Sequence, residues 1–157
     1  MDSIPDSLLQ YRRFLADEAA TLQLGTEWAA AVGAPLVVYL QGDLGAGKTT
    51  FARGLLRGFG HTGAVKSPTY AIVESYLLAG LTLHHFDLYR FSSPEEWEDA
   101  GLDDLISGNS ICLIEWPQQG GVYVPPADVT LTLNPQNGGR LALFTAHTEL
   151  GKRSLQV

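Results

Sequence analysis

The chain has 157 residues, and its 10 Lys and Arg against 17 Asp and Glu give a formal net charge of −7 and a pI of about 4.9. This length suits one compact domain, and a 45% hydrophobic content with a mean hydropathy of +0.04 excludes an intrinsically disordered chain. An acidic chain lacks the basic face that would hold nucleic acid by charge alone.

The same counts carry an expectation about location. Cys112 is the one cysteine, so no intrachain disulfide can form. The acidic start MDSIPDSLLQ does not match a secretory signal, and the longest strongly apolar run, 35–40, is far below the roughly 20 residues that cross a bilayer. We expect a cytoplasmic protein that does not associate with membranes.

Taken in chain order, the period of the apolar residues predicts alternating strands and helices. A short strand or lead-in over 11–16 precedes a helix over 17–32, with Asp17 as its N-cap. A continuously apolar, β-branched segment over 35–40 then predicts a buried parallel strand. It leads through a glycine-rich turn into a core-facing helix over 49–60.

The second half of the chain predicts more strands than helices. A hairpin over 70–78 and 81–89 is followed by a helix over 93–106, whose opening letters SPEE form a capping box with proline at the first helical position. A buried strand over 111–114 leads into a loop rich in Pro and Gly. Two further strands, 129–133 and 140–146, form a closing antiparallel pair. The pattern predicts one α/β domain over 1–157 with an antiparallel addition to the sheet.

The strongest chemical signal is the glycine-rich turn, because GDLGAGKT fits G-x-x-x-x-G-K-[ST] in full. In this motif backbone N–H groups surround a phosphate, and glycine permits their close approach. Lys48 supplies a cation for the β and γ phosphates, and Thr49 supplies a hydroxyl for Mg²⁺. The following helix directs the positive end of its dipole at the same phosphates. The residues expected to bind the nucleotide here are Asp43, Leu44, Gly45, Ala46, Gly47, Lys48, Thr49 and Thr50.

Two acids are candidates for metal binding and hydrolysis. Glu115 directly follows the apolar strand 111–114, where P-loop proteins place the acid that holds the metal; the alternative is a strand-end glutamate at the surface. Asp87 lies in HFDLYR, where it either accepts a hydrogen bond from the outer shell of the metal or orients the attacking water. The alternative is a structural pair with Arg90. Lys48, Asp87 and Glu115 are therefore the expected catalytic residues.

Other polar residues leave two interpretations open. Ser67 and Thr69 follow the motif's helix, where a nucleotide switch keeps a mobile segment, but the same letters also open ordinary turns. His84 and His85 are adjacent on a strand and face opposite sides, so we expect structural roles for both. Cys112 is expected to be a buried small hydrophobe.

Six acidic residues lie between 95 and 104 with no basic residue among them. Such a run is either a solvated helix face or a docking surface for a basic partner, and Trp97 in its midst keeps the second interpretation open.

In order, GDLGAGKTT, KSPTY, HFDLYR and IEWP resemble the TsaE (also YjeE) family, over about 17–140. The resemblance implies a three-layer P-loop NTPase-like fold with a mixed, partly antiparallel central sheet. It also implies an Mg²⁺-dependent ATPase needed for the threonylcarbamoyladenosine modification of tRNA. This family acts with the TsaD and TsaB subunits, and the tRNA would be contacted mainly through these partners.

The resemblance also assigns roles to residues. Lys48 would bind phosphates, Thr49 and Glu115 would hold Mg²⁺, and Asp87 would assist hydrolysis. Thr69 would belong to the switch loop, and Trp116 would shape the site. The family's adenine pocket corresponds to Glu18, Gly139 and Arg140.

Two rival functions remain open at this stage. A small kinase would transfer the γ-phosphate to a metabolite or nucleotide, but the scattered arginines do not form the lid typical of such enzymes. A nucleotide-switched binding module would use ATP only to lock a loop. The absence of an N-K-x-D string favours ATP over GTP.

Overall fold

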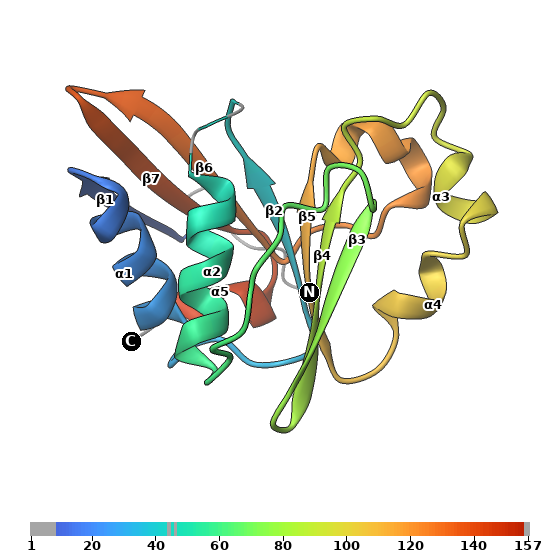
Figure 1. The fold of residues 1–157 in the computed structure, drawn as a ribbon, viewed down its shortest axis with the longest axis horizontal. Coiled ribbons are helices and arrows are strands. Elements are labelled where there is room, and N and C mark those ends of the chain that lie inside the picture. The colour runs from blue at the N-terminus through green and yellow to red at the C-terminus, as the bar shows by residue number, and fades with distance from the viewer. Residues whose placement is uncertain (1–8, 44, 46, 156–157) are drawn as a thin grey trace.

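The computed structural model describes residues 9–43, 45 and 47–155, and a seven-stranded mixed sheet forms its centre (Figure 1). The strand order is β1-β7-β6-β2-β5-β4-β3. The four strands β6, β2, β5 and β4 run parallel to their neighbours within this group. The antiparallel pairs are β1 with β7, β7 with β6, and β3 with β4. The strands are β1 Gln10–Leu15, β2 Leu36–Gln41, β3 Val73–Leu78, β4 Leu81–Asp87, β5 Ser110–Glu115, β6 Val129–Gln136 and β7 Gly139–Ala146.

Helices cover both faces of the sheet (Figure 1). On one face, α1 (Glu18–Trp28) and α2 (Lys48–Gly58) pack Leu24 and Phe51 into the same core as Val38 of β2. On the other face, α3 (Glu96–Asp99) and α4 (Asp103–Ile106) lie near the 3-10 helix η1 (Pro117–Tyr123), and a second core joins Trp97 to Phe86. The predicted three-layer α/β fold with a mixed sheet is confirmed.

Local signals explain where α1 begins and where the closing hairpin turns. Asp17 caps α1 by accepting a hydrogen bond from the backbone N–H of Ala20 at 2.9 Å, as predicted, although the helix ends at Trp28 and not at residue 32. Asn137 and Gly138, both with positive φ, form the tight turn between β6 and β7. β3 begins at Val73 and not at residue 70.

The prediction of a single helix over 93–106 is wrong, because the segment forms two helices, α3 and α4, with a break at Gly101. Gly101 has φ +68° and ends α3 in a Schellman motif, in which Leu102 N–H donates to the Trp97 carbonyl at 3.2 Å and Gly101 N–H to the Glu98 carbonyl at 2.9 Å. One half of the capping box is present, since the Glu96 carboxylate accepts the Ser93 N–H at 3.1 Å. The loop expected over 116–128 contains η1, and the tail adds α5 (Glu149–Leu155).

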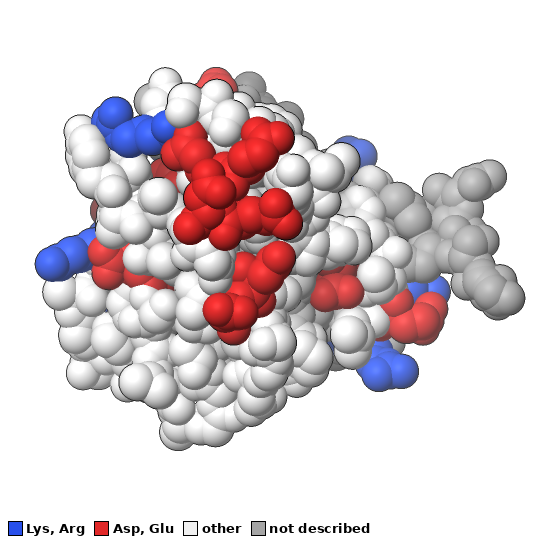
Figure 2. Space-filling view, turned by 90° about the vertical axis from the view of Figure 1, so that its right-hand side faces the viewer, with Lys and Arg blue, Asp and Glu red and all other residues white. Residues whose placement is uncertain are grey.

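The acidic run forms an exposed cluster on the face that carries α3 and α4 (Figure 2). Trp97 takes no part in that surface, because it is fully buried against Phe86 and its indole N–H donates to Asp103 at 2.7 Å. The tryptophan is therefore a core residue and gives no support to a docking surface. No helix among the described residues is long and apolar enough to span a membrane.

Candidate nucleotide site

The glycine-rich turn joins the carboxyl end of β2 to the start of α2. Gly45 and Gly47 have φ of +80° and +102°, left-handed values that residues with a Cβ rarely adopt, so glycine is needed at both positions. The Lys48 side chain is buried, and its ammonium donates to the Gly42 carbonyl at 2.7 Å. Leu44 and Ala46, also expected at this site, lie outside the described residues.

Sheet register brings Asp87 and Glu115 together. β4 and β5 are adjacent and parallel, and Asp87 pairs with Glu115 at their carboxyl ends. Paired residues of neighbouring strands point to the same face, here the face covered by α2. Both residues are buried, each with 4% of its whole surface exposed, so Glu115 is not the surface glutamate that was the alternative interpretation.

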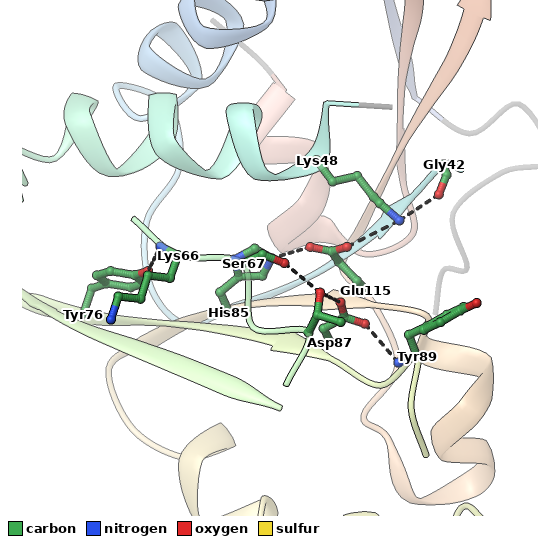
Figure 3. A network of polar contacts seen from close by, with 10 residues as sticks. Gly42, Lys48, Lys66, Ser67, Tyr76, His85, Asp87, Tyr89 and Glu115 are labelled. Atoms are coloured by element: carbon green, nitrogen blue, oxygen red, sulfur yellow. Dashed lines mark hydrogen bonds and ion pairs between the residues drawn. The ribbon is translucent and has the colours of Figure 1, made fainter. Parts of the chain in front are cut away.

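Each oxygen of the Glu115 carboxylate has its own partner (Figure 3). One oxygen lies 3.4 Å from Lys48 Nζ and the other 2.6 Å from His85 Nε2. Burial raises the pKa of Glu115, but the hydrogen bond from His85 and the Lys48 ammonium lower it more, so the pKa lies below its usual value. Glu115 is therefore a carboxylate at neutral pH.

Each carboxylate oxygen of Asp87 also accepts a hydrogen bond (Figure 3). One oxygen accepts the Tyr89 N–H at 2.9 Å, and the other accepts the Thr69 hydroxyl at 3.2 Å. Thr69 in turn shares a 2.8 Å hydrogen bond with Ser67. No ion pair joins Asp87 to Arg90 in the described part of the chain. The Arg90 guanidinium instead lies over the Tyr70 ring, 4.2 Å from its centre.

Lys48, Asp87 and Glu115 line one open pocket of about 320 Å³. It brings Glu18 and Arg140, which are far apart in the sequence, to the P-loop: Thr50 donates to Glu18 at 3.3 Å, and Arg140 donates to the Gly45 carbonyl at 2.6 Å. The lining residues are Glu18, Thr21, Gly45, Gly47, Lys48, Thr49, Thr50, Ser67, Thr69, Asp87, Glu115 and Arg140.

The remaining expected residues lie at the edges of this pocket. Gly139 and Asp43 line a neighbouring cavity of about 480 Å³ beside the β6–β7 turn. Trp116 has a left-handed backbone with φ +57°, and the Lys48 ammonium lies 5.0 Å from the centre of its ring. Trp116 thus contacts the lysine from outside the main pocket.

Sequence reasoning missed His85, which is fully buried beside Glu115. The expectation that the two histidines face opposite sides is confirmed, since His84 bonds to Ser75 at 2.7 Å and not to the site. The available signal was strand parity: His85 and Asp87 are two residues apart on β4 and so share one face.

Comparison with known proteins agrees with this architecture. The family model described as threonylcarbamoyl adenosine biosynthesis protein TsaE matches residues 15–142. A tRNA threonylcarbamoyladenosine biosynthesis protein TsaE from Haemophilus influenzae is 45% identical over 97% of this chain and 98% of its own length. A Rickettsia conorii protein of the same name is 35% identical over 89% of this chain and 81% of its own.

A solved structure shares the whole fold. The crystal structure of Bacillus subtilis YdiB superimposes with a TM-score of 0.79 at 28% identity, covering 94% of this chain and 92% of that one. The family match and the two relatives each extend over most of the sequence. This chain belongs to the TsaE family.

Proposed function

We propose that this protein is an ATP-hydrolysing subunit required for the threonylcarbamoyladenosine modification of tRNA. The observation that carries the proposal is the pocket in which the described residues of the P-loop meet two buried carboxylates, Asp87 and Glu115, at the ends of adjacent parallel strands. This is the place where open α/β sheets bind ligands.

The residues divide the work between binding and hydrolysis. The P-loop backbone and Lys48 bind the phosphates and stabilise the charge that develops on them. We propose that Glu18, Gly139 and Arg140 contact the adenosine, since Glu18 and Arg140 line the P-loop pocket and Gly139 lines the neighbouring cavity. Asp87, fixed by the Tyr89 N–H and the Thr69 hydroxyl, orients the attacking water.

The donor set fits magnesium. Among the described residues, Thr49 and Glu115 line the pocket and offer the hydroxyl and carboxylate oxygens that this hard cation prefers. Thr49 and Glu115 would hold Mg²⁺, which would neutralise negative charge on the phosphates of the nucleotide.

The names of the relatives support the proposed pathway. The relatives are named for tRNA threonylcarbamoyladenosine biosynthesis. We propose that this chain acts there with TsaD and TsaB, and that these partners hold the tRNA, because a net charge of −7 opposes direct binding.

Three substitutions test the division of labour. Lys48→Ala is expected to abolish nucleotide binding, because it removes the buried cation. Asp87→Ala and Glu115→Ala are expected to retain binding and to lose at least about 100-fold in turnover. Binding of a fluorescent ATP analogue and release of inorganic phosphate are measured on each purified variant, with the exposed Glu149→Ala as the control.

Each rival function has its own outcome in these assays. Equal loss of binding in all three variants would contradict the division of labour. Labelled γ-phosphate recovered on an acceptor molecule would favour a kinase. Intact tRNA modification by the Asp87→Ala and Glu115→Ala proteins would favour a nucleotide switch without essential catalysis.

A further inference from the structure

We propose that His85 is a positioning residue, which holds the Glu115 carboxylate in the orientation that binds the metal of the nucleotide. The inference rests on the proposed function, because it takes Glu115 as a metal ligand. It concerns a residue that does not line the nucleotide pocket.

The first argument is the placement of His85. Its side chain is 0% exposed on β4, a strand flanked by β3 and β5. In register it lies opposite the buried Leu113 of β5, two residue pairs before the Asp87–Glu115 pair and so on the same face of the sheet. A ring enclosed in this way has little freedom to rotate, so it offers a fixed hydrogen-bond donor.

The second argument is the hydrogen bond itself (Figure 3). His85 Nε2 lies 2.6 Å from Glu115 Oε2, the short distance typical of a bond to a charged acceptor. An ionised carboxylate only accepts hydrogen bonds, so the hydrogen lies on Nε2. The second ring nitrogen, Nδ1, is buried and has no hydrogen-bond partner within the described part of the chain, so Glu115 is the one group there that bonds to the ring.

The two oxygens of the Glu115 carboxylate have different partners. His85 holds Oε2, and Oε1 lies toward Lys48 in the pocket at 3.4 Å. Without His85 the carboxylate could rotate about its terminal torsion, which has a broad energy profile. Partners of this kind orient metal ligands, and their loss typically weakens metal affinity by about 10–100-fold.

The test measures metal-dependent nucleotide binding, not turnover. A fluorescent ADP analogue is titrated in EDTA and then at increasing Mg²⁺ with the full chain. His85→Leu is expected to bind the analogue in EDTA like wild type and to need about 10–100-fold more Mg²⁺ for half of the metal-dependent gain. His85→Gln, whose amide nitrogen can take the place of Nε2, is expected to stay close to wild type.

Two comparisons separate positioning from a merely structural role. In a Glu115→Gln background, His85→Leu should cause no further shift in the Mg²⁺ requirement, because it acts through Glu115. His85→Asn, with an amide one bond too short to reach Oε2, should resemble His85→Leu. The Gln and Asn variants carry the test if the Leu variant does not fold.

The outcomes distinguish this inference from the proposed function. If Glu115→Gln raises the Mg²⁺ requirement but a folded His85→Leu does not, the role of His85 is wrong and the proposed function stands. Equal Mg²⁺ requirements for the Gln and Asn variants would also overturn it. If Glu115→Gln itself leaves the requirement unchanged, Glu115 is not a metal ligand and both proposals fail.

Discussion

At the scale of single residues, the site is organised around buried charge that is matched locally. Lys48 and Glu115 are each 6% exposed, and a buried charge is tolerated only when it has close partners. The Gly42 carbonyl accepts a hydrogen bond from Lys48, and His85 donates one to Glu115. These contacts hold both side chains in fixed positions, which suits a preorganised phosphate site.

Cys112 provides a residue-scale test of the packing beneath that site. Its side chain is 1% exposed on β5, and burial raises the pKa of the thiol to about 11. Because the thiolate is the reactive form, we expect almost no labelling by a thiol reagent at pH 8 in the native protein. One equivalent should react in denaturant.

The reaction is followed with a chromogenic disulfide reagent, with and without guanidinium. Fast stoichiometric labelling of the native protein would show that β5 is not enclosed between the two helical layers. The sequence already predicts this cysteine as a buried hydrophobe, and the structure confirms it.

Residue types were easier to predict than their partners. The P-loop letters and the acid after a buried strand are local signals, so Lys48, Thr49 and Glu115 could be singled out. That Asp87 lies opposite Glu115 depends on strand order, and His85 became visible only with that register. The Arg140 contact with Gly45 joins positions 95 residues apart and has no local signal.

At the scale of elements, the close packing of α1 on α2 positions the P-loop helix. A Cβ added at Gly54 would overlap the Leu22 carbonyl, and one added at Gly25 would overlap the Phe51 carbonyl. These glycines let the two helix backbones touch. The contact also brings Glu18 and Thr21, at the start of α1, to the pocket at the P-loop.

We therefore expect Gly54→Ala to destabilise the protein by about 2 kcal/mol, because the overlap outweighs the higher helix propensity of alanine. Unfolding by urea measures the change. Gly33→Ala is the matched control, since nothing lies within 4 Å of its added Cβ. A Gly54→Ala protein as stable as the control would show that the helices lie farther apart.

Elements with strong local signals were predicted well, and weaker ones were not. Long apolar strands and the capped α1 agree with the sequence. The break between α3 and α4 was missed, although Gly101 followed by the buried Leu102 is the signature of a Schellman end. The break lets both Trp97 and Leu102 reach the second core.

At the scale of the whole molecule, the distribution of charge bears on the proposal that this protein works with partner subunits. The acidic cluster on α3 and α4 leaves that face unsuited to a phosphate backbone (Figure 2). The pocket supplies Lys48 and Arg140 as cations, but no other Lys or Arg from the described residues lines it. We therefore expect slow hydrolysis by the chain alone and stimulation by partner subunits.

The most direct test of the central claim is the steady-state rate of ATP hydrolysis by this chain, alone and with TsaD and TsaB. The account predicts a slow rate that depends on Mg²⁺, rises when both partners are added and is lost in Asp87→Ala. A fast rate for the isolated chain, with no response to TsaD and TsaB, would contradict it.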